Sequence, residues 1–403
     1  MTTSIDAQYD QYLSAGLALD LTRGKPCSDQ LDLSCALEDM IAGNFKTADG
    51  TDARNYGGLL GIPDARALGG TLLDVDPKYI MAGGNSSLTL MYQFLVWRLK
   101  AWQENDPMQT FKFICVVPGY DRHFTICEHL GIEMISVGFD ADGPNMTKIE
   151  ALVRQDQNIK GIWCVPKHSN PTGHTYSQAT VERLANLPNL AGKDFIIMWD
   201  NAYAAHDLDP RTMPLTNLMA RAQAAQTAHQ VALFASTSKI TFAGAGLAFC
   251  GLSEPMLQGF ETFLTPQMIG FDKVNQLRHA RLLKDSNDIA KHMAAHRVIL
   301  EPKFQRVQEK LMPLAEADLA TWSQPGGGYF VSLDLKAASA TQVIALANAA
   351  GVKLTPAGAT FPYGRDPEDK NIRIAPSFPD MMELDQALDV LVCCIVKASE
   401  MDR

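Results

Sequence analysis

The middle of the chain alternates short apolar runs, rich in β-branched residues, with longer amphipathic stretches. The runs have the length of single strands, and the stretches between them have the length of helices. Because parallel strands need a crossover between them, this alternation predicts an α/β fold with a mostly parallel sheet flanked by helices. The predicted strands cover residues 79–82, 111–117, 133–139, 161–165, 195–199, 231–235 and 247–252, and helices are predicted over 86–100 and 178–187.

The pattern changes after Phe271, where residues 273–297 predict one long helix. Pro302 is expected to interrupt or restart it, because proline lacks an amide hydrogen and clashes with the preceding turn. The remaining sequence predicts a smaller α+β unit with strands over 328–333 and 352–354 and a helix over 341–350. Gly351 follows that helix, as is typical of a C-terminal cap.

Three parts are expected from these patterns. Residues 1–45 form an N-terminal segment that packs on the small domain, residues 46–290 form the large domain, and residues 291–403 form the small C-terminal domain.

The net charge of −10 disfavours a nucleic-acid partner, which needs a basic face. The eight cysteines form no CxxC pair and show no His/Cys spacing typical of a metal site. We therefore expect no bound metal and a reducing, intracellular compartment. Because Arg23 is the first basic residue and no apolar leader precedes it, we expect no signal peptide and a cytoplasmic location.

Lys239 is the only formally charged residue between Ala222 and Ser253. A membrane-spanning helix is one interpretation of this stretch, but its serines, threonines and glycines favour two short strands instead. Lysines at strand ends usually extend into solvent. The alternative is a buried amine with a lowered pKa, suited to forming a Schiff base with an aldehyde. The neighbouring hydroxyls and flexible backbone favour that alternative and would suit a phosphate; they belong to Ser236, Thr237, Ser238, Gly244 and Gly246.

Asp200 and Asn170 follow two other predicted strands. Ligands in open α/β sheets bind outside the carboxyl ends of the strands, so these side chains are candidates for one site. Taken alone, Asp200 could equally be a helix cap, and the Asn170-Pro171-Thr172-Gly173 segment could be an ordinary turn.

The ordered set of segments is more specific than any one of them. It consists of Gly83-Gly84-Asn85-Ser86, Pro118-Gly119-Tyr120, Asn170-Pro171-Thr172-Gly173, Asp200-Asn201-Ala202-Tyr203, Ser236-Thr237-Ser238-Lys239 and Arg373. This series resembles the class I/II aminotransferases, which are pyridoxal 5′-phosphate (PLP) enzymes of fold type I. The phrases at residues 20–26, 118–123 and 238–244 resemble the bacterial, corynebacterial-type aspartate aminotransferases. The resemblance implies a large PLP-binding domain with a seven-stranded sheet and a smaller α+β domain.

The resemblance also implies roles around the cofactor ring. Lys239 would carry PLP as a Schiff base and act as the base that moves the proton, and Asp200 would hold the pyridine nitrogen protonated. Tyr120 would stack on the ring, and His123 would support Asp200 from behind. A core histidine satisfied by backbone is the alternative for His123.

Further cofactor contacts are implied in the same way. Asn170 and Tyr203 would contact the phenolic oxygen of PLP. Tyr56 matches a tyrosine that reaches the phosphate of a neighbouring subunit, which implies a homodimer with shared active sites; local packing of a loop aromatic is the alternative. The phosphate would be bound by Asn85, Ser86, Ser236 and Ser238. Many relatives also bind the phosphate through an arginine eight residues after the lysine, where this chain has Leu247.

Arg373 matches the arginine that binds the substrate α-carboxylate through a bidentate fork. An exposed strand arginine is the alternative. The resemblance places Gly24, Arg23 and Arg122 at the substrate as well. A dicarboxylic substrate needs a second cation, and Arg122, Arg23, Lys25 and Lys167 all remain candidates.

The predicted function is ping-pong transamination from aspartate to 2-oxoglutarate, giving oxaloacetate and glutamate. Another acidic or aromatic amino acid, or a PLP lyase reaction, remains possible on this fold. An effector-binding regulatory module is disfavoured, because it would need a basic DNA-binding segment before Tyr56. The expected partners are small amino and 2-oxo acids, without nucleic acid or membrane.

Overall fold

The computed structural model describes residues 4–209 and 211–401. Its large unit is built on a seven-stranded sheet with the strand order β2-β10-β9-β8-β7-β3-β4. The strands are β2 (Ile80–Ala82), β3 (Lys112–Val116), β4 (Glu133–Val137), β7 (Ile159–Cys164), β8 (Ile196–Asp200), β9 (Val231–Ser236) and β10 (Ala248–Leu252). All seven predicted strands are therefore present, and the predicted fold class is confirmed.

Strand β10 is antiparallel to both of its neighbours, β2 and β9, whereas the other pairs are parallel. The residues from Ala222 to Ser253, which carry the single charge of Lys239, form the end of one helix and the strands β9 and β10. The prediction of two short strands in this stretch, in place of a membrane-spanning helix, is thus confirmed. Within the described ranges, no helix combines the length and apolarity that a membrane span requires.

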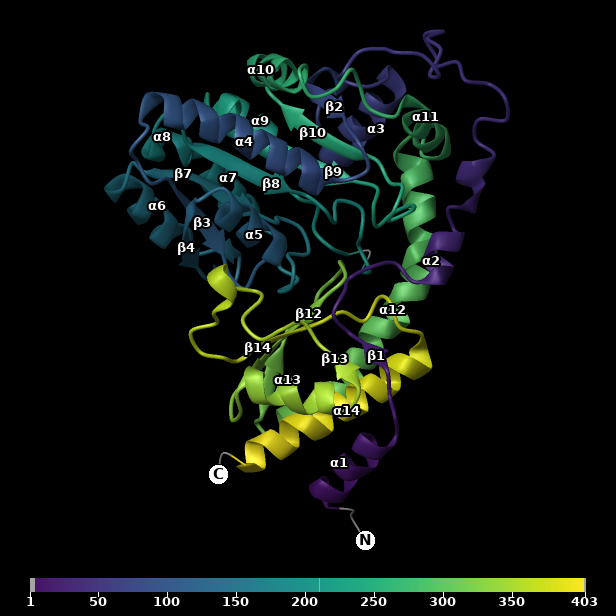
Figure 1. The fold of residues 1–403 in the computed structure, drawn as a ribbon, viewed down its shortest axis with the longest axis vertical. Coiled ribbons are helices and arrows are strands. Elements are labelled where there is room, and N and C mark those ends of the chain that lie inside the picture. Colours follow the sequence, from purple (N-terminus) through teal and green to yellow (C-terminus); the bar gives the residue numbers. More distant parts are fainter. Residues whose placement is uncertain (1–3, 210, 402–403) are drawn as a thin grey trace.

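Alternating side chains of each strand face opposite sides of the sheet, and each side is covered by helices (Figure 1). Ile197 and Trp199 face a core shared with α3 (Pro63–Leu73), α6 (Met146–Gln155), α7 (Gln178–Asn186), α8 (Pro188–Ala191) and α9 (Leu218–Ala224). Ile196 and Met198 face a second core with α4 (Ser87–Asn105), α5 (Asp121–His129) and α10 (Glu254–Leu264). A two-stranded ribbon, β5 (Phe139–Asp140) with β6 (Gly143–Pro144), follows β4.

The small unit contains a three-stranded antiparallel sheet and its own apolar core. Its elements are β11 (Ala320–Trp322), β12 (Val331–Leu335), α13 (Ala340–Ala349), β13 (Val352–Lys353), β14 (Asn371–Ile374) and α14 (Met381–Met401). The strand predicted over 328–333 begins three residues later. Gly351 ends the α13 turn with a φ of +85°, a conformation that glycine adopts without strain.

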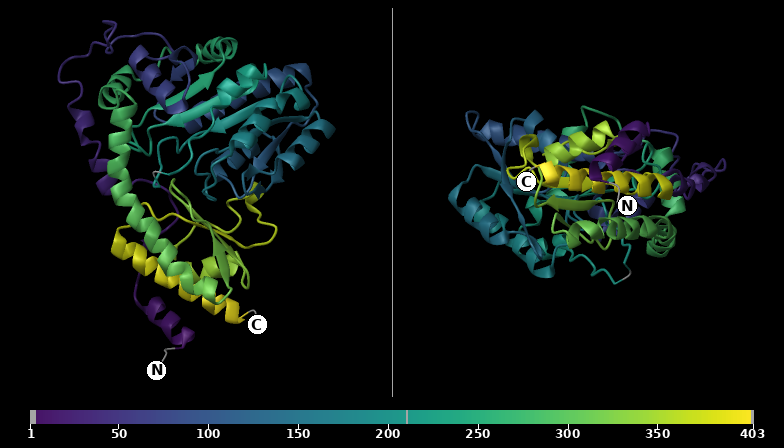
Figure 2. Two further views of the ribbon diagram at one scale, coloured as in Figure 1. Left: turned by 180° about the vertical axis from the view of Figure 1, so that it is seen from behind. Right: turned by 90° about the horizontal axis from the view of Figure 1, so that it is seen from below.

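The start of the N-terminal segment packs on this small unit (Figure 2), whereas Ile41, near its end, belongs to the apolar core of the large unit. Helix α1 (Ile5–Ser14) contacts α14, and β1 (Leu19–Asp20) pairs in parallel with β13. Helix α2 (Ser28–Asp32) lies against α12, the long helix that runs past both units. The boundaries near residues 45 and 290 remain a prediction, since residue 290 lies inside α12.

The prediction of a single helix over residues 273–297 was wrong. The structure has α11 (Lys273–Leu282) and α12 (Ser286–Glu316), and Asp285 caps α12 by accepting hydrogen bonds from the amides of Asn287 and Asp288. Pro302 does not interrupt α12. It lies on the exposed side of the helix, as does Val298 four residues earlier, so water can satisfy the carbonyl that proline leaves without a donor.

Candidate active site

A cavity of about 590 Å³ lies between the two units, at the carboxyl ends of the parallel strands. The large unit lines it with side chains that follow β3, β7, β8 and β9, and the small unit and N-terminal segment close it from the other side. The lining residues are Thr22, Arg23, Gly24, Lys25, Tyr120, Asp121, Arg122, Asn170, Tyr203, Lys239, Phe330, Thr355, Pro356, Ala359 and Arg373. Most of the residues predicted to contact substrate are therefore brought together.

Lys239 lies in the loop that reverses the chain between β9 and β10. Thr237 closes this loop, because its amide donates to the carbonyl of Leu247 (2.8 Å) and its hydroxyl accepts from the amide of Leu247 (2.9 Å). The Lys239 ammonium lies 5.0 Å from the centre of the Tyr203 ring. Burial lowers the pKa of Lys239, and the nearby Asp200 charge opposes that shift only in part. Burial thus shifts this amine toward its neutral, nucleophilic form.

Two buried side chains hold the Lys239 backbone. His206 Nε2 lies 3.2 Å from the Lys239 carbonyl oxygen, and the Tyr329 hydroxyl donates to the same oxygen at 3.1 Å. Gln30 in turn donates to Tyr329 (2.8 Å) and lies 2.9 Å from His296 Nδ1, which links the N-terminal segment and α12 to the lysine loop. The backbone of Lys239 is therefore positioned independently of its side chain.

Asp200 and His123 form a buried pair at the end of β8. His123 Nε2 lies 3.0 Å from Asp200 Oδ2, and both side chains are at most 3% exposed. The imidazole stacks on Trp163 with the two ring centroids 4.0 Å apart, and Tyr120 packs edge-on against the imidazole with a centroid distance of 5.0 Å. Asp200 Oδ1 is buried and has no hydrogen-bond partner among the described residues. The carboxylate thus keeps one oxygen available for a donor from outside the chain.

Arg373 lies in the middle of β14 and is 8% exposed. Its guanidinium donates to Asp121 (3.0 Å), Asn170 (3.4 Å) and Thr355 (3.3 Å) and lies over the Phe330 ring. Among the described residues, its buried Nε has no acceptor. An inward-facing arginine with a donor to spare can bind a further carboxylate.

The predicted phosphate residues also lie together. The Ser238 hydroxyl donates to the backbone carbonyl of Asn85 (3.3 Å), and the side-chain Nδ2 of Asn85 donates to the Gly244 carbonyl (3.2 Å). The Ser236 hydroxyl accepts from the Ser238 amide (3.4 Å). Ser86 is the N-cap residue of the 19-residue helix α4, but its hydroxyl makes no capping hydrogen bond. Backbone amides at a helix N-terminus next to uncommitted hydroxyls are a typical phosphate site.

The whole chain, residues 1–403, matches the aspartate amino-transferase family. This chain belongs to the aspartate aminotransferase family. It is 43% identical to the aspartate aminotransferase of Corynebacterium glutamicum over 98% of this chain and 93% of that protein. The crystal structure of an aspartate transaminase from the same organism covers 99% of this chain and 96% of that one, with a TM-score of 0.94 and 42% identity.

A more distant structure shows the same fold. The α-aminoadipate aminotransferase LysN of Thermus thermophilus, complexed with N-(5′-phosphopyridoxyl)-L-leucine, has a TM-score of 0.78 at 18% identity, covering 99% of this chain and 96% of that one. Membership of the aspartate aminotransferase family makes this protein an aminotransferase. The predictions of the family, the fold class and the enzyme class are thereby confirmed.

Some residues predicted for this aminotransferase site lie elsewhere in the chain. Tyr56 is 78% exposed and lines a different cavity. Lys167 does not line the substrate cavity, because its ammonium binds Asp207 (2.8 Å) and the Ala204 carbonyl. Of the cations considered for a side-chain carboxylate, Arg23, Lys25 and Arg122 remain at the cavity.

Other cavity residues of the aminotransferase were not predicted. Thr355 and Pro356 follow directly after the strand predicted over 352–354, so the rule that polar residues after a strand form sites would have found Thr355. No pattern in the sequence indicated that Phe330 would line the cavity. It packs against Gly24, where the ring leaves no room for a side chain. The close approach of the Phe330 ring therefore explains why residue 24 is a glycine.

Two buried histidines of this aminotransferase give its stability a pH dependence. Burial lowers the pKa of His206 to about 3 and that of His296 to about 4, below the ordinary value near 6.5. Both stay neutral in the folded protein, while the unfolded chain takes up protons below pH 6.5. The free energy of unfolding should therefore fall as pH drops from about 6.5 to about 4, by up to about 1.4 kcal/mol per pH unit for each histidine.

Urea unfolding of the wild type and of His296→Gln between pH 7 and pH 4.5 measures this slope. The variant should lose less stability on acidification than the wild type, whereas the exposed-site control His229→Gln should follow the wild type. If the free energy of unfolding changed equally with pH in His296→Gln and in the wild type, His296 would not be a source of the pH dependence.

Proposed function

We propose that this aminotransferase binds PLP covalently through Lys239 and transfers the amino group of aspartate to 2-oxoglutarate. The supporting observation is the geometry of the cavity. A lysine whose pKa is lowered by burial faces the same space as an inward-facing arginine, next to a buried carboxylate with one unpaired oxygen. The LysN structure carries a phosphopyridoxyl group on the same fold.

The residues present suit this cofactor. The unpaired Asp200 Oδ1 can accept the N–H of a protonated pyridine ring, and His123 holds the other oxygen of that carboxylate in place. The uncapped Ser86 hydroxyl and the neighbouring amides can receive the phosphate. Asn170 is buried beside the cavity and Tyr203 lies next to the lysine, where both can contact the phenolic oxygen.

When bound, PLP supplies an electron sink for the pair of electrons left when the substrate Cα–H bond breaks. The chain then has three tasks. Arg373 binds the α-carboxylate and so orients the Cα–H bond, with the Asp121 contact exchanged for the substrate. Lys239 Nζ, whose pKa is lowered by burial, removes the Cα proton after the substrate amine has displaced it, and gives that proton up again later in the reaction. Asp200 keeps the ring nitrogen charged.

Borohydride reduction of the holoenzyme followed by peptide mapping tests the cofactor attachment. We expect the modification on Lys239. Incubation with aspartate and 2-oxoglutarate should then yield oxaloacetate and glutamate. An unmodified Lys239 would refute the attachment, and alanine with CO2 formed from aspartate in place of oxaloacetate and glutamate would indicate a decarboxylase.

Arg122 is our candidate for the distal carboxylate of aspartate. It lines the cavity next to Asp121, which contacts Arg373, and its own side chain is exposed enough to turn toward a substrate. Arg122→Ala should lower kcat/KM for aspartate about 10- to 100-fold, the loss expected for a charge-assisted hydrogen bond, and leave alanine nearly unchanged. Steady-state kinetics with both donors checks this, and an equal loss for both would exclude the role.

We further propose that the enzyme acts as a cytoplasmic homodimer. Tyr56 and Ile269 are large apolar side chains that lie 78% and 65% exposed beside one cavity, a surface that a second copy would cover. All eight cysteines are free, which suits a reducing compartment. Analytical ultracentrifugation should give twice the chain mass, and Tyr56→Ala should weaken PLP binding if the residue reaches the partner's phosphate.

A further inference from the structure

The turn that carries Lys239 ends in two carbonyl groups that no backbone amide satisfies. Residues 237–241 form a single helical turn, in which the amides of Ile240 and Thr241 both donate to the Thr237 carbonyl (2.8 and 2.7 Å). A turn this short leaves its last carbonyls without the donors that a longer helix would supply. In the described part of the chain, no backbone amide donates to the carbonyl of Lys239 or of Ile240. These two carbonyls therefore need donors from side chains.

Three other segments supply those donors. The Lys239 carbonyl accepts from the Tyr329 hydroxyl (3.1 Å) and lies 3.2 Å from His206 Nε2. The Ile240 carbonyl lies 2.8 Å from His292 Nε2, and because a carbonyl can only accept, this nitrogen carries the hydrogen and donates it. His292 belongs to α12, and Tyr329 belongs to the core of the small unit. The lysine turn is thus joined at adjacent carbonyls to the long helix and to the small unit.

A further histidine, His279 of α11, holds the turn through Thr241. Burial lowers the pKa of His279, so its ring is neutral at pH 7. Its Nδ1 lies 2.9 Å from the Asn275 carbonyl and carries the ring hydrogen, which leaves Nε2 as an acceptor. The Thr241 hydroxyl lies 2.9 Å from both this Nε2 and the Thr237 hydroxyl, so it donates to the imidazole and accepts from Thr237. The Thr237 oxygen in turn accepts from the Leu247 amide, which closes the lysine loop.

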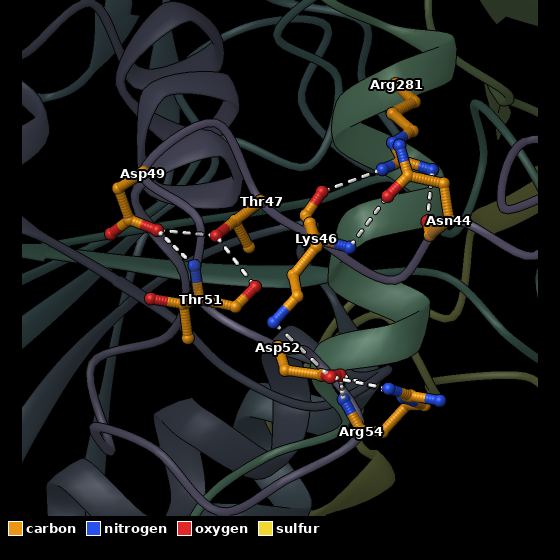
Figure 3. A network of polar contacts seen from close by, with 8 residues as sticks. All are labelled: Asn44, Lys46, Thr47, Asp49, Thr51, Asp52, Arg54 and Arg281. Atoms are coloured by element: carbon orange, nitrogen blue, oxygen red, sulfur yellow. Dashed lines mark hydrogen bonds and ion pairs between the residues drawn. The ribbon is translucent and has the colours of Figure 1, made fainter.

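Helix α11 supports the turn from a fixed position. Arg281, two residues after His279, donates to the backbone carbonyls of Asn44 and Lys46, each at 2.8 Å (Figure 3). These contacts fasten α11 to the loop that begins at Asn44. The histidine and the arginine of one helix therefore bind two separate backbone segments, and only His279 reaches the lysine turn.

Histidines are concentrated around this turn. Four of the nine histidines in the chain contact it directly or through one neighbour, namely His206, His279, His292 and His296. None of these four lines the substrate cavity, so contact with substrate does not explain their placement. Their shared target is the backbone on either side of the lysine, which points to positioning of that residue.

We propose that His292 and His279 are positioning residues of the transamination reaction. They act through the Ile240 carbonyl and Thr241, and they hold the lysine turn so that the amine need not be ordered when it meets the cofactor and the substrate Cα. Ordering a side chain on binding weakens the binding, and a misplacement of about 1 Å can lower a rate about 100-fold. This inference rests on the proposed function for the role of Lys239.

The test compares His292→Met with His292→Gln. The two replacements have the same length and similar helix propensity, but only glutamine has an Nε2 donor, the same number of bonds from the backbone as that of histidine, for the Ile240 carbonyl. The matched control is Gln230→Met. The buried Gln230 side chain also donates to backbone carbonyls, those of Gly192 (2.8 Å) and Phe195 (2.9 Å), but at the amino end of β8, away from the cavity.

Each apoenzyme is titrated with pyridoxal, which lacks the phosphate, so its affinity reports the amine of Lys239 and not the phosphate site. His292→Met should bind pyridoxal about 10-fold more weakly, and its holoenzyme should have a kcat about 10-fold lower with nearly unchanged KM for aspartate. His292→Gln should recover most of both losses. Gln230→Met should lower the melting temperature at least as much as His292→Met, while its kcat and pyridoxal affinity stay within about two-fold of the wild type.

Thr241→Val tests the other support of the turn. Valine keeps the shape of threonine and removes the hydroxyl that joins His279 to Thr237. This variant should also weaken pyridoxal binding and lower kcat. It decides the proposal on its own if His292→Met does not fold.

The proposal is overturned for His292 if His292→Met matches Gln230→Met in pyridoxal affinity and kcat, or if His292→Gln loses as much as His292→Met. It is overturned for His279 if Thr241→Val matches Gln230→Met. A wild type that carries PLP on Lys239 and transaminates while these variants are unaltered refutes the positioning alone.

Failure of the proposed function gives a different result, an unmodified Lys239 after borohydride reduction of the wild type. Hydrogen exchange of the amides of residues 237–247 in the apoenzymes then still decides whether His292 holds the turn. Exchange should be faster in His292→Met than in His292→Gln and Gln230→Met, and equal exchange in all three would refute the contact as a support of the turn.

Discussion

Replacing Lys239 with alanine is expected to abolish multiple turnover, lowering kcat by roughly 10⁴-fold or more, and to remove the visible absorbance of bound PLP. The variant loses both the amine that attaches the cofactor and the base that moves the Cα proton. Steady-state assays with aspartate and 2-oxoglutarate and an absorbance spectrum of the purified protein check both effects.

The variant should remain folded, which makes its loss of activity interpretable. His206 and Tyr329 contact the Lys239 carbonyl oxygen, and alanine keeps that carbonyl. Burial disfavours the charged form of the Lys239 amine, so removing this amine removes an unfavourable contribution to the folding free energy. The Lys239→Ala apoenzyme should therefore be no less stable to heat than the wild-type apoenzyme. Added primary amines should partly restore turnover. Retained multiple turnover without them would disprove the role of Lys239.

Asp200→Asn is expected to lower kcat about 10³-fold, equivalent to about 4 kcal/mol, with little change in KM. Asparagine has the shape of aspartate and can still bond His123, so the pair should stay in place. It lacks the negative charge that would keep a pyridine nitrogen protonated. Since Lys239 is intact, the variant should still bind PLP, and its absorbance spectrum should show this.

Asp207→Asn is the matched control for that experiment. Asp207 is also a carboxylate near the end of β8, but it binds Lys167 and His168 and does not line the substrate cavity. This substitution should reduce stability and leave kcat within a few-fold of the wild type. If Asp200→Asn behaved like Asp207→Asn, the charge of Asp200 would have no role in the reaction.

The sheet of the large unit was predictable because its signal is local. Each strand, such as Ile196–Asp200, is a continuous apolar run with few alternatives, and its carboxyl end carries the polar residue of the site. The direction of the strands was harder to predict from the sequence. The loop from 237 to 247 returns β10 antiparallel to β9, a choice made by the Thr237–Leu247 contacts, which no periodicity signals.

The helices after Phe271 show where local patterns mislead. The amphipathic pattern continues across residues 283–285, so nothing in the spacing marks the break that Asp285 stabilises as a cap. Conversely, Pro302 is a strong local signal for interruption, yet the helix continues because that residue lies on the solvent side. A local cap decides the first outcome and burial decides the second, and burial depends on the whole fold.

The sequence by itself determined the α/β architecture and the candidate residues of the site, because strand runs and ordered motifs are properties of neighbouring residues. Only the tertiary structure brought Arg373 within 3.4 Å of Asn170, 203 positions earlier in the chain. Such contacts depend on how distant side chains pack and on which charges they exclude from water. No pattern along the chain encodes the packing of these distant side chains.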